Sequence, residues 1–148
     1  MTRPSLRVEN LMTMSQGELD DLFRESPTGD IPAGAGRGTV VLAPGTAVTA
    51  PAARLIHALA WQGKIVDPDK GELRNRISPL GIPAIKAEVY LGTSLFDGRK
   101  SIVLDYSKTS LVARLVRDEI RLVGSSLYLG LVFWDYAKVL NFTLDFSS

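Results

Sequence analysis

The stretch "LVRDEIRLVG", residues 115–124, is compatible with two secondary structures, and the choice between them decides the fold class. At helical spacing its apolar residues form one stripe and its charged residues form the opposite, solvated face. At strand spacing Asp118, Ile120 and Leu122 share one face, and the charged residues between them share the other. The strand therefore places Asp118 on an otherwise apolar face, where a carboxylate needs either a partner or a function.

The residues that follow favour the strand for most of this stretch. "RLVGSSLYL" is typical of a hairpin, with Gly124 in a short polar loop between two apolar runs. The apolar run after that loop needs a pairing partner, and the preceding segment is the nearest one. We therefore predict a short helical turn near Ser110–Leu115 and then a strand from about Arg117 to Val123.

Further strand-like segments, rich in Val, Ile, Phe and Tyr, occupy much of the chain after Gly38. They are residues 39–43, 63–67, 72–78, 84–91, 100–106, 127–134 and 138–146. Most of the connections are too short for crossover helices, so neighbouring strands must pair antiparallel as a meander. We predict a mainly β protein, an up-and-down antiparallel barrel of about eight strands.

The N-terminal part of the chain is expected to add one or two short helices to the barrel. Residues 1–14 lack periodicity and are predicted to form a flexible arm, so that residues 15–148 form the single barrel domain. Residues 15–26 begin with the capping-box pair Ser15 and Glu18 and predict a helix. The stretch 50–63, "APAARLIHALAWQG", predicts another helix. Residues 27–39 are rich in glycine and lack the Lys-Ser/Thr pair of a phosphate-binding loop, so we interpret them as a connector.

Composition excludes several classes of function. A chain of 148 residues with 45% hydrophobic and 22% charged residues is typical of one globular domain. A net charge of +1 argues against general nucleic-acid binding. Without cysteine there can be no disulfide or thiolate zinc site, and the single His57 cannot build a multi-histidine centre. We therefore expect no metal and no obligatory cofactor.

The expected location is the cytoplasm. The first residues show no apolar core followed by a cleavage site, as a secretory signal would. The longest apolar run, which begins at Leu127, is too short to span a bilayer as a helix.

Polar residues on strand faces that otherwise look apolar are the candidates for a binding site. Asn75, Asp118, Tyr128 and Asn141 have such positions, and nearby arginines and tyrosines could donate hydrogen bonds to them. The predicted ligand-binding residues are Asn75, Arg76, Tyr90, Tyr106, Arg121, Tyr128, Phe133, Trp134 and Asn141. The predicted apolar wall consists of Ile85, Val89, Val103, Leu129, Phe133, Trp134 and Phe142. The alternative is a satisfied internal hydrogen-bond network, or an Asp118 that simply faces water.

A second acid, Asp105, ends a predicted strand beside Tyr106, whereas Asp97 belongs to an Asp-Gly turn and is expected to be structural. If the barrel is an enzyme, Asp118 and Asp105 are the catalytic candidates. Two acids whose surroundings separate their pKa values can divide proton donation and acceptance between them.

The order of segments from "WQGKIVD" through "NRISPLGIPAIKAEVY", "FDGRKSIVLDYSKTS" and "RDEIRLV" to "LYLGLVFW" resembles small bacterial barrels of the lipocalin-like, or calycin, type. The resemblance covers roughly residues 38–146, but the G-x-W motif common near the first lipocalin strand is absent, and Trp61 precedes Gly63 instead. The resemblance carries over no functional residue. It implies a hydrophobic interior that holds one apolar or amphipathic molecule. Some similar barrels in natural-product pathways catalyse cyclisations.

Three functions remain open at this point. The first is the binding of a small hydrophobic or amphipathic molecule in the barrel, which would act as a monomer or homodimer. The second is a cofactor-independent isomerase or cyclase that uses the same cavity with an aspartate as general acid and base. The third is a packed barrel with a structural or interaction role, in which the helix at residues 15–24 could dock another chain.

Overall fold

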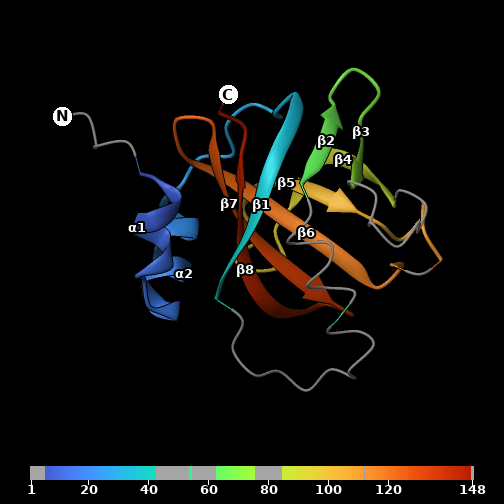
Figure 1. Ribbon diagram of the computed structural model, residues 1–148. Coiled ribbons are helices and arrows are strands. Elements are labelled where there is room, and N and C mark those ends of the chain that lie inside the picture. Colours follow the sequence, from blue (N-terminus) through green and yellow to red (C-terminus); the bar gives the residue numbers. More distant parts are fainter. Residues whose placement is uncertain (1–5, 43–53, 55–62, 76–84, 112, 148) are drawn as a thin grey trace.

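The protein is a closed, eight-stranded antiparallel barrel with two short helices near its N-terminus (Figure 1). The computed structural model describes residues 6–42, 54, 63–75, 85–111 and 113–147. Its helices are α1 (Val8–Met12) and α2 (Gln16–Glu25). Its strands are β1 (Gly34–Leu42), β2 (Lys64–Asp67), β3 (Glu72–Asn75), β4 (Lys86–Thr93), β5 (Lys100–Asp105), β6 (Val116–Gly124), β7 (Leu127–Trp134) and β8 (Ala137–Asp145). The predicted fold class is confirmed.

The strands pair in chain order, and closure comes from β1, which pairs with both β2 and β8. Closure leaves each strand with two neighbours, so the backbone donors and acceptors of the sheet are used within it. Alternate residues of every strand then point either into the barrel or out of it.

Residues 116–124, which are compatible with a helix or a strand in sequence, form strand β6. β6 pairs with β5 on one side and with β7 on the other, and a hairpin at residues 125–126 leads from β6 to β7. The predicted helical turn is a single tight turn, in which the Val116 amide donates to the Ala113 carbonyl oxygen at 2.9 Å. Strand pairing prevails because a helix here would leave β5 and β7 without a common neighbour.

The barrel interior is apolar over most of its length. Its buried residues include Val66, Leu73, Ala87, Val89, Ile102, Leu104, Val116, Ile120, Val132, Leu140, Phe142 and Leu144. Glycines make room for the large rings: a methyl group at Gly130 would collide with the Phe142 ring, and one at Gly36 would collide with Phe146. Large rings of the interior therefore lie over glycines of the adjacent strand.

Both helices pack against one side of the barrel's outer surface, α1 near β1 and α2 near β6, with β7 and β8 also on that side (Figure 1). A second core forms there between Leu11, Leu19 and Phe23 of the helices and Leu129, Leu131 and Phe133 of β7. β7 is thus buried on both faces, which explains why its sequence is an unbroken apolar run.

Two expectations for the N-terminal part need correction. Residues 8–12, expected within a flexible arm, form α1, because the burial of Leu11 fixes a helix too short to show periodicity. The glycine-rich connector ends in strand β1, whose glycine at position 36 admits the Phe146 ring. The capped helix at residues 15–26 is confirmed, with its reciprocal Ser15–Glu18 bonds, as α2. The helix predicted at 50–63 lies almost entirely outside the described residues.

We expect Gly130→Ala to destabilise the barrel by about 1–3 kcal/mol, because the added methyl group overlaps the Phe142 ring in a packed interior. Urea unfolding followed by circular dichroism measures the change in the free energy of unfolding.

The matched control is Gly17→Ala in α2, where the nearest atom to the new methyl group is Ser15 Oγ at 4.0 Å. This variant should be unchanged or up to about 1 kcal/mol more stable, since alanine favours a helix over glycine. Equal stability of the two variants would contradict the packing described for Phe142.

Candidate functional site

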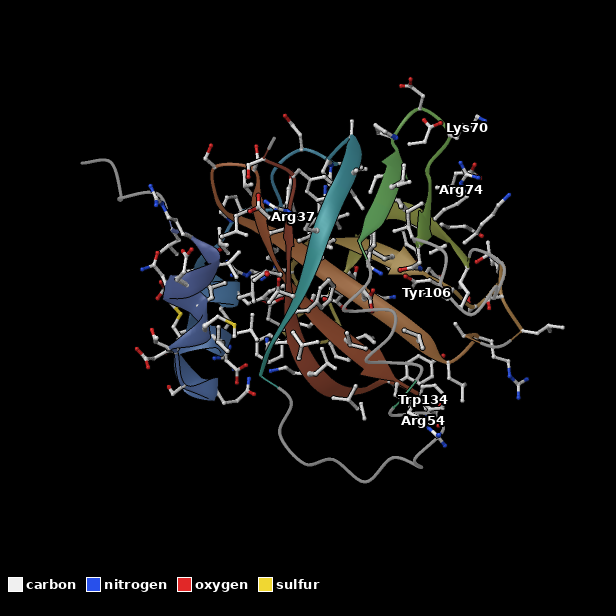
Figure 2. All side chains as sticks on the ribbon, viewed as in Figure 1. Arg37, Arg54, Lys70, Arg74, Tyr106 and Trp134 are labelled. Atoms are coloured by element: carbon white, nitrogen blue, oxygen red, sulfur yellow. The ribbon has the colours of Figure 1, made fainter. Side chains whose placement is uncertain are left out.

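Four buried polar side chains meet inside the barrel: Lys64, Asn75, Tyr106 and Asp118. Lys64 Nζ donates to Asn75 Oδ1 at 2.6 Å and to the Tyr106 hydroxyl at 2.8 Å, and it lies 3.6 Å from Asp118 Oδ2. Asn75 Nδ2 also donates to the Tyr106 hydroxyl, at 2.9 Å. We call these four residues the interior polar cluster. Figure 2 places Tyr106 within the barrel, between the end at Trp134 and the end at Lys70.

Strand alternation and register bring the cluster together. Lys64, the first residue of β2, pairs in register with Asn75, the last residue of β3. Both side chains lie on the inner face of the barrel, as do those of Val66 and Leu73. Asp118 is the β6 partner of Leu104, and Tyr106 follows β5 two residues later on the same face. Three strands, and the residue just beyond β5, thus each supply one polar group to the inside of one region of the barrel.

Burial governs the electrostatics of the cluster, because Lys64 and Asp118 have 0% and 2% of their side-chain surfaces exposed. Desolvation raises the pKa of Asp118 to about 6, although the nearby ammonium opposes that shift. Desolvation also lowers the pKa of Lys64, against the attraction of Asp118, and it raises the pKa of Tyr106. Burial disfavours the charged forms of both Lys64 and Asp118. An apolar pair at these positions would therefore stabilise the fold at least as well as the ion pair does.

The cluster is incompletely satisfied. Asp118 Oδ1 is buried and has no hydrogen-bond partner among the residues that the structure describes. Such an atom is costly in an apolar interior and attracts a donor from water or from a bound molecule. Asp118 is therefore available for an interaction that the described residues do not themselves supply.

The structure brings together three of the residues predicted for the site. Asn75, Tyr106 and Asp118 belong to the cluster. Trp134 packs on the same inner core, toward one end of the barrel (Figure 2). Tyr128 also belongs to the inner core, but its hydroxyl donates to the Asp30 carbonyl oxygen at 2.6 Å, several residues along the barrel from Asp118.

Other predicted site residues point outward. Arg121 donates to both carboxylate oxygens of Asp97, at 2.6 and 2.7 Å, and to the Phe23 carbonyl oxygen at 2.8 Å, which fastens α2 to the barrel. Asn141 accepts from Gln16 of α2 at 3.0 Å. Arg121 pairs in register with Leu129, so it shares the outer face of that strand pair rather than the face of Asp118.

The second predicted acid, Asp105, also lies outside. It accepts from the Tyr90 hydroxyl at 2.7 Å and borders a shallow surface depression of about 130 Å³ with Arg114 and Tyr136. Asp105 is adjacent to Leu104, the inward-facing partner of Asp118, so the two acids are on opposite sides of the sheet wall. The proposed division of acid and base roles between them is therefore not supported.

The structure assigns the residues of the predicted apolar wall to both sides of the sheet. Ile85, Val89, Trp134 and Phe142 belong to the inner core. Leu129 and Phe133 instead pack under the helices, and Val103 pairs with Glu119 on the outer side. Because β7 is apolar on both faces, its sequence alone does not tell which face is inner. Arg76 lies outside the described residues.

Sequence reasoning missed Lys64, the cation of the cluster. Strand alternation could have indicated its burial, because Lys64 lies two residues before Val66 and therefore on the same face of β2. Val66 pairs with Leu73, and Leu73 lies on the same face of β3 as Asn75. Reading that signal requires the β2–β3 register, and Ile65 and Val66 are equally apolar in sequence, so either face could have been the buried one.

Among the described residues no group of His, Asp and Glu has the arrangement of a metal site. The helices in that part of the chain include none with the length and apolarity needed to cross a bilayer.

Comparison with known proteins supports the fold and no specific function. No protein-family model matches the sequence, and no curated protein does either. A solved structure of a protein from Thermomonospora curvata is similar, with a TM-score of 0.58 and 17% sequence identity over 91% of this chain and 89% of the other. At that identity the likeness concerns the barrel architecture alone.

Removing one member of the ion pair should destabilise the protein more than removing both. We expect Lys64→Met and Asp118→Leu each to lower the free energy of unfolding by about 3–5 kcal/mol, since each leaves one buried charge unpaired. The double variant should recover most of that loss and could exceed the wild type by about 1–4 kcal/mol. Urea unfolding of the wild type, the two single variants and the double variant completes a double-mutant cycle, which gives the coupling free energy of the pair. Additive losses in the double variant would mean that the pair is not coupled.

Asp118 should titrate near pH 6, and its protonation should stabilise the fold. The folded protein holds this proton more tightly than the unfolded chain, in which the pKa is about 3.9. The stabilisation is therefore full below about pH 4 and is lost as the pH rises through about 6. The measurement is an NMR titration of the Asp118 carboxyl carbon, together with urea unfolding between pH 4 and 7.5.

The control for this titration is Asp97, whose pKa is held well below its usual range, first of all by its hydrogen bonds from Arg121. Its carboxyl carbon should not titrate over the same interval. As the pH falls from 7.5 to 4, the free energy of unfolding of the wild type should rise relative to that of the Lys64→Met/Asp118→Leu double variant. A midpoint for Asp118 near 4 would contradict the burial argument.

Proposed function

We propose that the barrel binds a small amphipathic organic molecule in its interior, with an apolar body along the inner wall and a polar group on the interior polar cluster. The observation that carries this proposal is the unpartnered Asp118 Oδ1 in an otherwise apolar barrel. Ligand sites commonly combine apolar walls with a few placed polar groups that fix orientation.

The stability argument supports the same conclusion. A buried ion pair contributes little net stability compared with an apolar pair of similar volume. A binding function gives a reason for keeping Lys64 and Asp118 in the interior. We propose the cytoplasm as the protein's place of action.

An acid–base enzyme is the second candidate, and the specific observation in its favour is the raised pKa of Asp118, to about 6, beside a free carboxylate oxygen. A carboxylate with a pKa near the working pH suits a general base. This isomerase or cyclase would act on the same bound molecule with Asp118 alone, because Asp105 lies outside the barrel. It therefore depends on the binding site proposed above.

Binding inside the barrel predicts that the fluorophore N-phenyl-1-naphthylamine increases its emission on adding the protein, with saturation at one molecule per chain. Val132→Phe, which enlarges an inner residue opposite Asp118, should weaken this binding at least about tenfold by occupying the site. Fluorescence titration measures the affinity, and thermal melting shows whether the variant is folded.

The matched control is Glu88→Phe, which places the same ring at a half-exposed position of β4, two residues from the outward-facing Tyr90. Its affinity should equal that of the wild type. No saturable binding to the wild-type protein would overturn the proposal and favour a barrel filled by its own side chains. Equal weakening by both variants would place the fluorophore somewhere other than the interior.

A further inference from the structure

The hydrogen-bonding capacity of the interior polar cluster defines what kind of polar group it can receive. Lys64 Nζ is surrounded by oxygen atoms of Asn75, Tyr106 and Asp118, at 2.6, 2.8 and 3.6 Å. This arrangement suits the ammonium form, which has three donors and no acceptor. An ammonium group can only donate to the Tyr106 hydroxyl, so the Tyr106 oxygen is the acceptor of that bond.

The Tyr106 hydroxyl oxygen accepts a second bond, from Asn75 Nδ2 at 2.9 Å. The orientation of the Asn75 amide follows from its other contacts, because Oδ1 accepts from Lys64 and Nδ2 donates to the Ile85 carbonyl oxygen. With both acceptor positions used, the Tyr106 hydroxyl keeps its own hydrogen for donation. Within the described part of the chain it donates to no residue.

Among the described residues the cluster thus leaves one donor unused, the Tyr106 O–H, and one acceptor, Asp118 Oδ1. Both residues contact the same lysine ammonium, so they are neighbours in the barrel interior. A single hydroxyl group has the complementary capacity: its oxygen can accept from Tyr106 and its hydrogen can be donated to Asp118. An ether or a ketone can satisfy only Tyr106.

We propose that the molecule bound in the barrel is a neutral compound that carries a hydroxyl group, an alcohol or an enol, and that Tyr106 and Asp118 select it. This inference rests on the proposed binding function and names its ligand class. A carboxylate, such as a fatty acid anion, is disfavoured because it would bring a second negative charge against Asp118 in a desolvated interior. Specificity arises because a neutral group that can only accept, such as an ether or a ketone, leaves the buried Asp118 Oδ1 unpaired.

The test compares three probes of similar size: 1-decanol, methyl nonyl ether and decanoate. Each competes with N-phenyl-1-naphthylamine for the wild-type protein at pH 8, where Asp118 is ionised. We expect decanol to bind about tenfold more tightly than the ether, because the ether leaves the Asp118 oxygen without a donor. Decanoate should bind more weakly than decanol.

Two variants separate the two roles. In Asp118→Asn the new amide should turn its oxygen toward Lys64 and its NH₂ group toward the ligand, so the preference for decanol over the ether should disappear. In Tyr106→Phe both probes lose the same donor, so both should bind more weakly while their ratio stays near that of the wild type. Circular dichroism verifies the fold of each variant.

The outcomes distinguish the two proposals. If the fluorophore does not bind to the wild-type protein, the binding function itself fails. If the fluorophore binds but decanol and the ether displace it equally, the binding function stands and the selection of a hydroxyl group is wrong, with an internal water satisfying the cluster. If Asp118→Asn does not fold, the ratio of the affinities for decanol and for the ether still tests the inference in the other two proteins. A ratio near one in the wild type overturns it, and so does the loss of the wild-type ratio in Tyr106→Phe.

Discussion

Pairing of the first strand with the last defines the inside and the outside of this protein. When β1 pairs with β8, the sheet closes and every strand residue is assigned either to the enclosed interior or to the outer surface. Closure also brings polar residues from β2, β3 and β6, and one just beyond β5, into one enclosed region, although they are far apart in sequence. An open sheet with the same pairings would expose Lys64 and Asp118 to water, where neither pKa would shift.

The two faces of β6 show how one strand serves two cores. Asp118 points inward to Lys64, while Arg121 points outward, lies over the Phe23 ring at 4.2 Å and binds Asp97. The outward contact fixes α2 and covers the apolar face of β7. Two of the charged residues that suggested a solvated helix, Asp118 and Arg121, are thus buried ion-pair partners on opposite sides of the barrel wall. The two ion pairs differ in geometry. Arg121 and Asp97 form two short hydrogen bonds on the outer side, whereas the inner Lys64–Asp118 distance is longer and Asp118 Oδ1 has no partner among the described residues.

That contrast supports a function for the interior polar cluster. The bidentate Arg121–Asp97 pair joins a helix to the barrel, which is a structural task with a visible result. The Lys64–Asp118 pair lies between β2 and β6, which are not neighbours in the sheet. Backbone hydrogen bonds to two adjacent strands already hold each of them, and the pair adds a cost in desolvation. A group that the fold does not need, and that retains an unused donor and acceptor, is better explained by a molecule that it binds.

The strand segments, their antiparallel order and the barrel class could all be predicted from the sequence, because β-branched runs and short turns are local signals. The sequence also singled out Asn75, Tyr106 and Asp118 as polar residues on apolar strands. Only the tertiary structure decided which face of each strand is inner, since β7 is apolar on both faces and Lys64 gives no sign of burial in its own segment. It separated Asp105, Arg121 and Asn141 from the cluster by turning them outward. The physical reason is that register and closure are non-local: a side chain becomes interior only when strands distant in sequence pair around it.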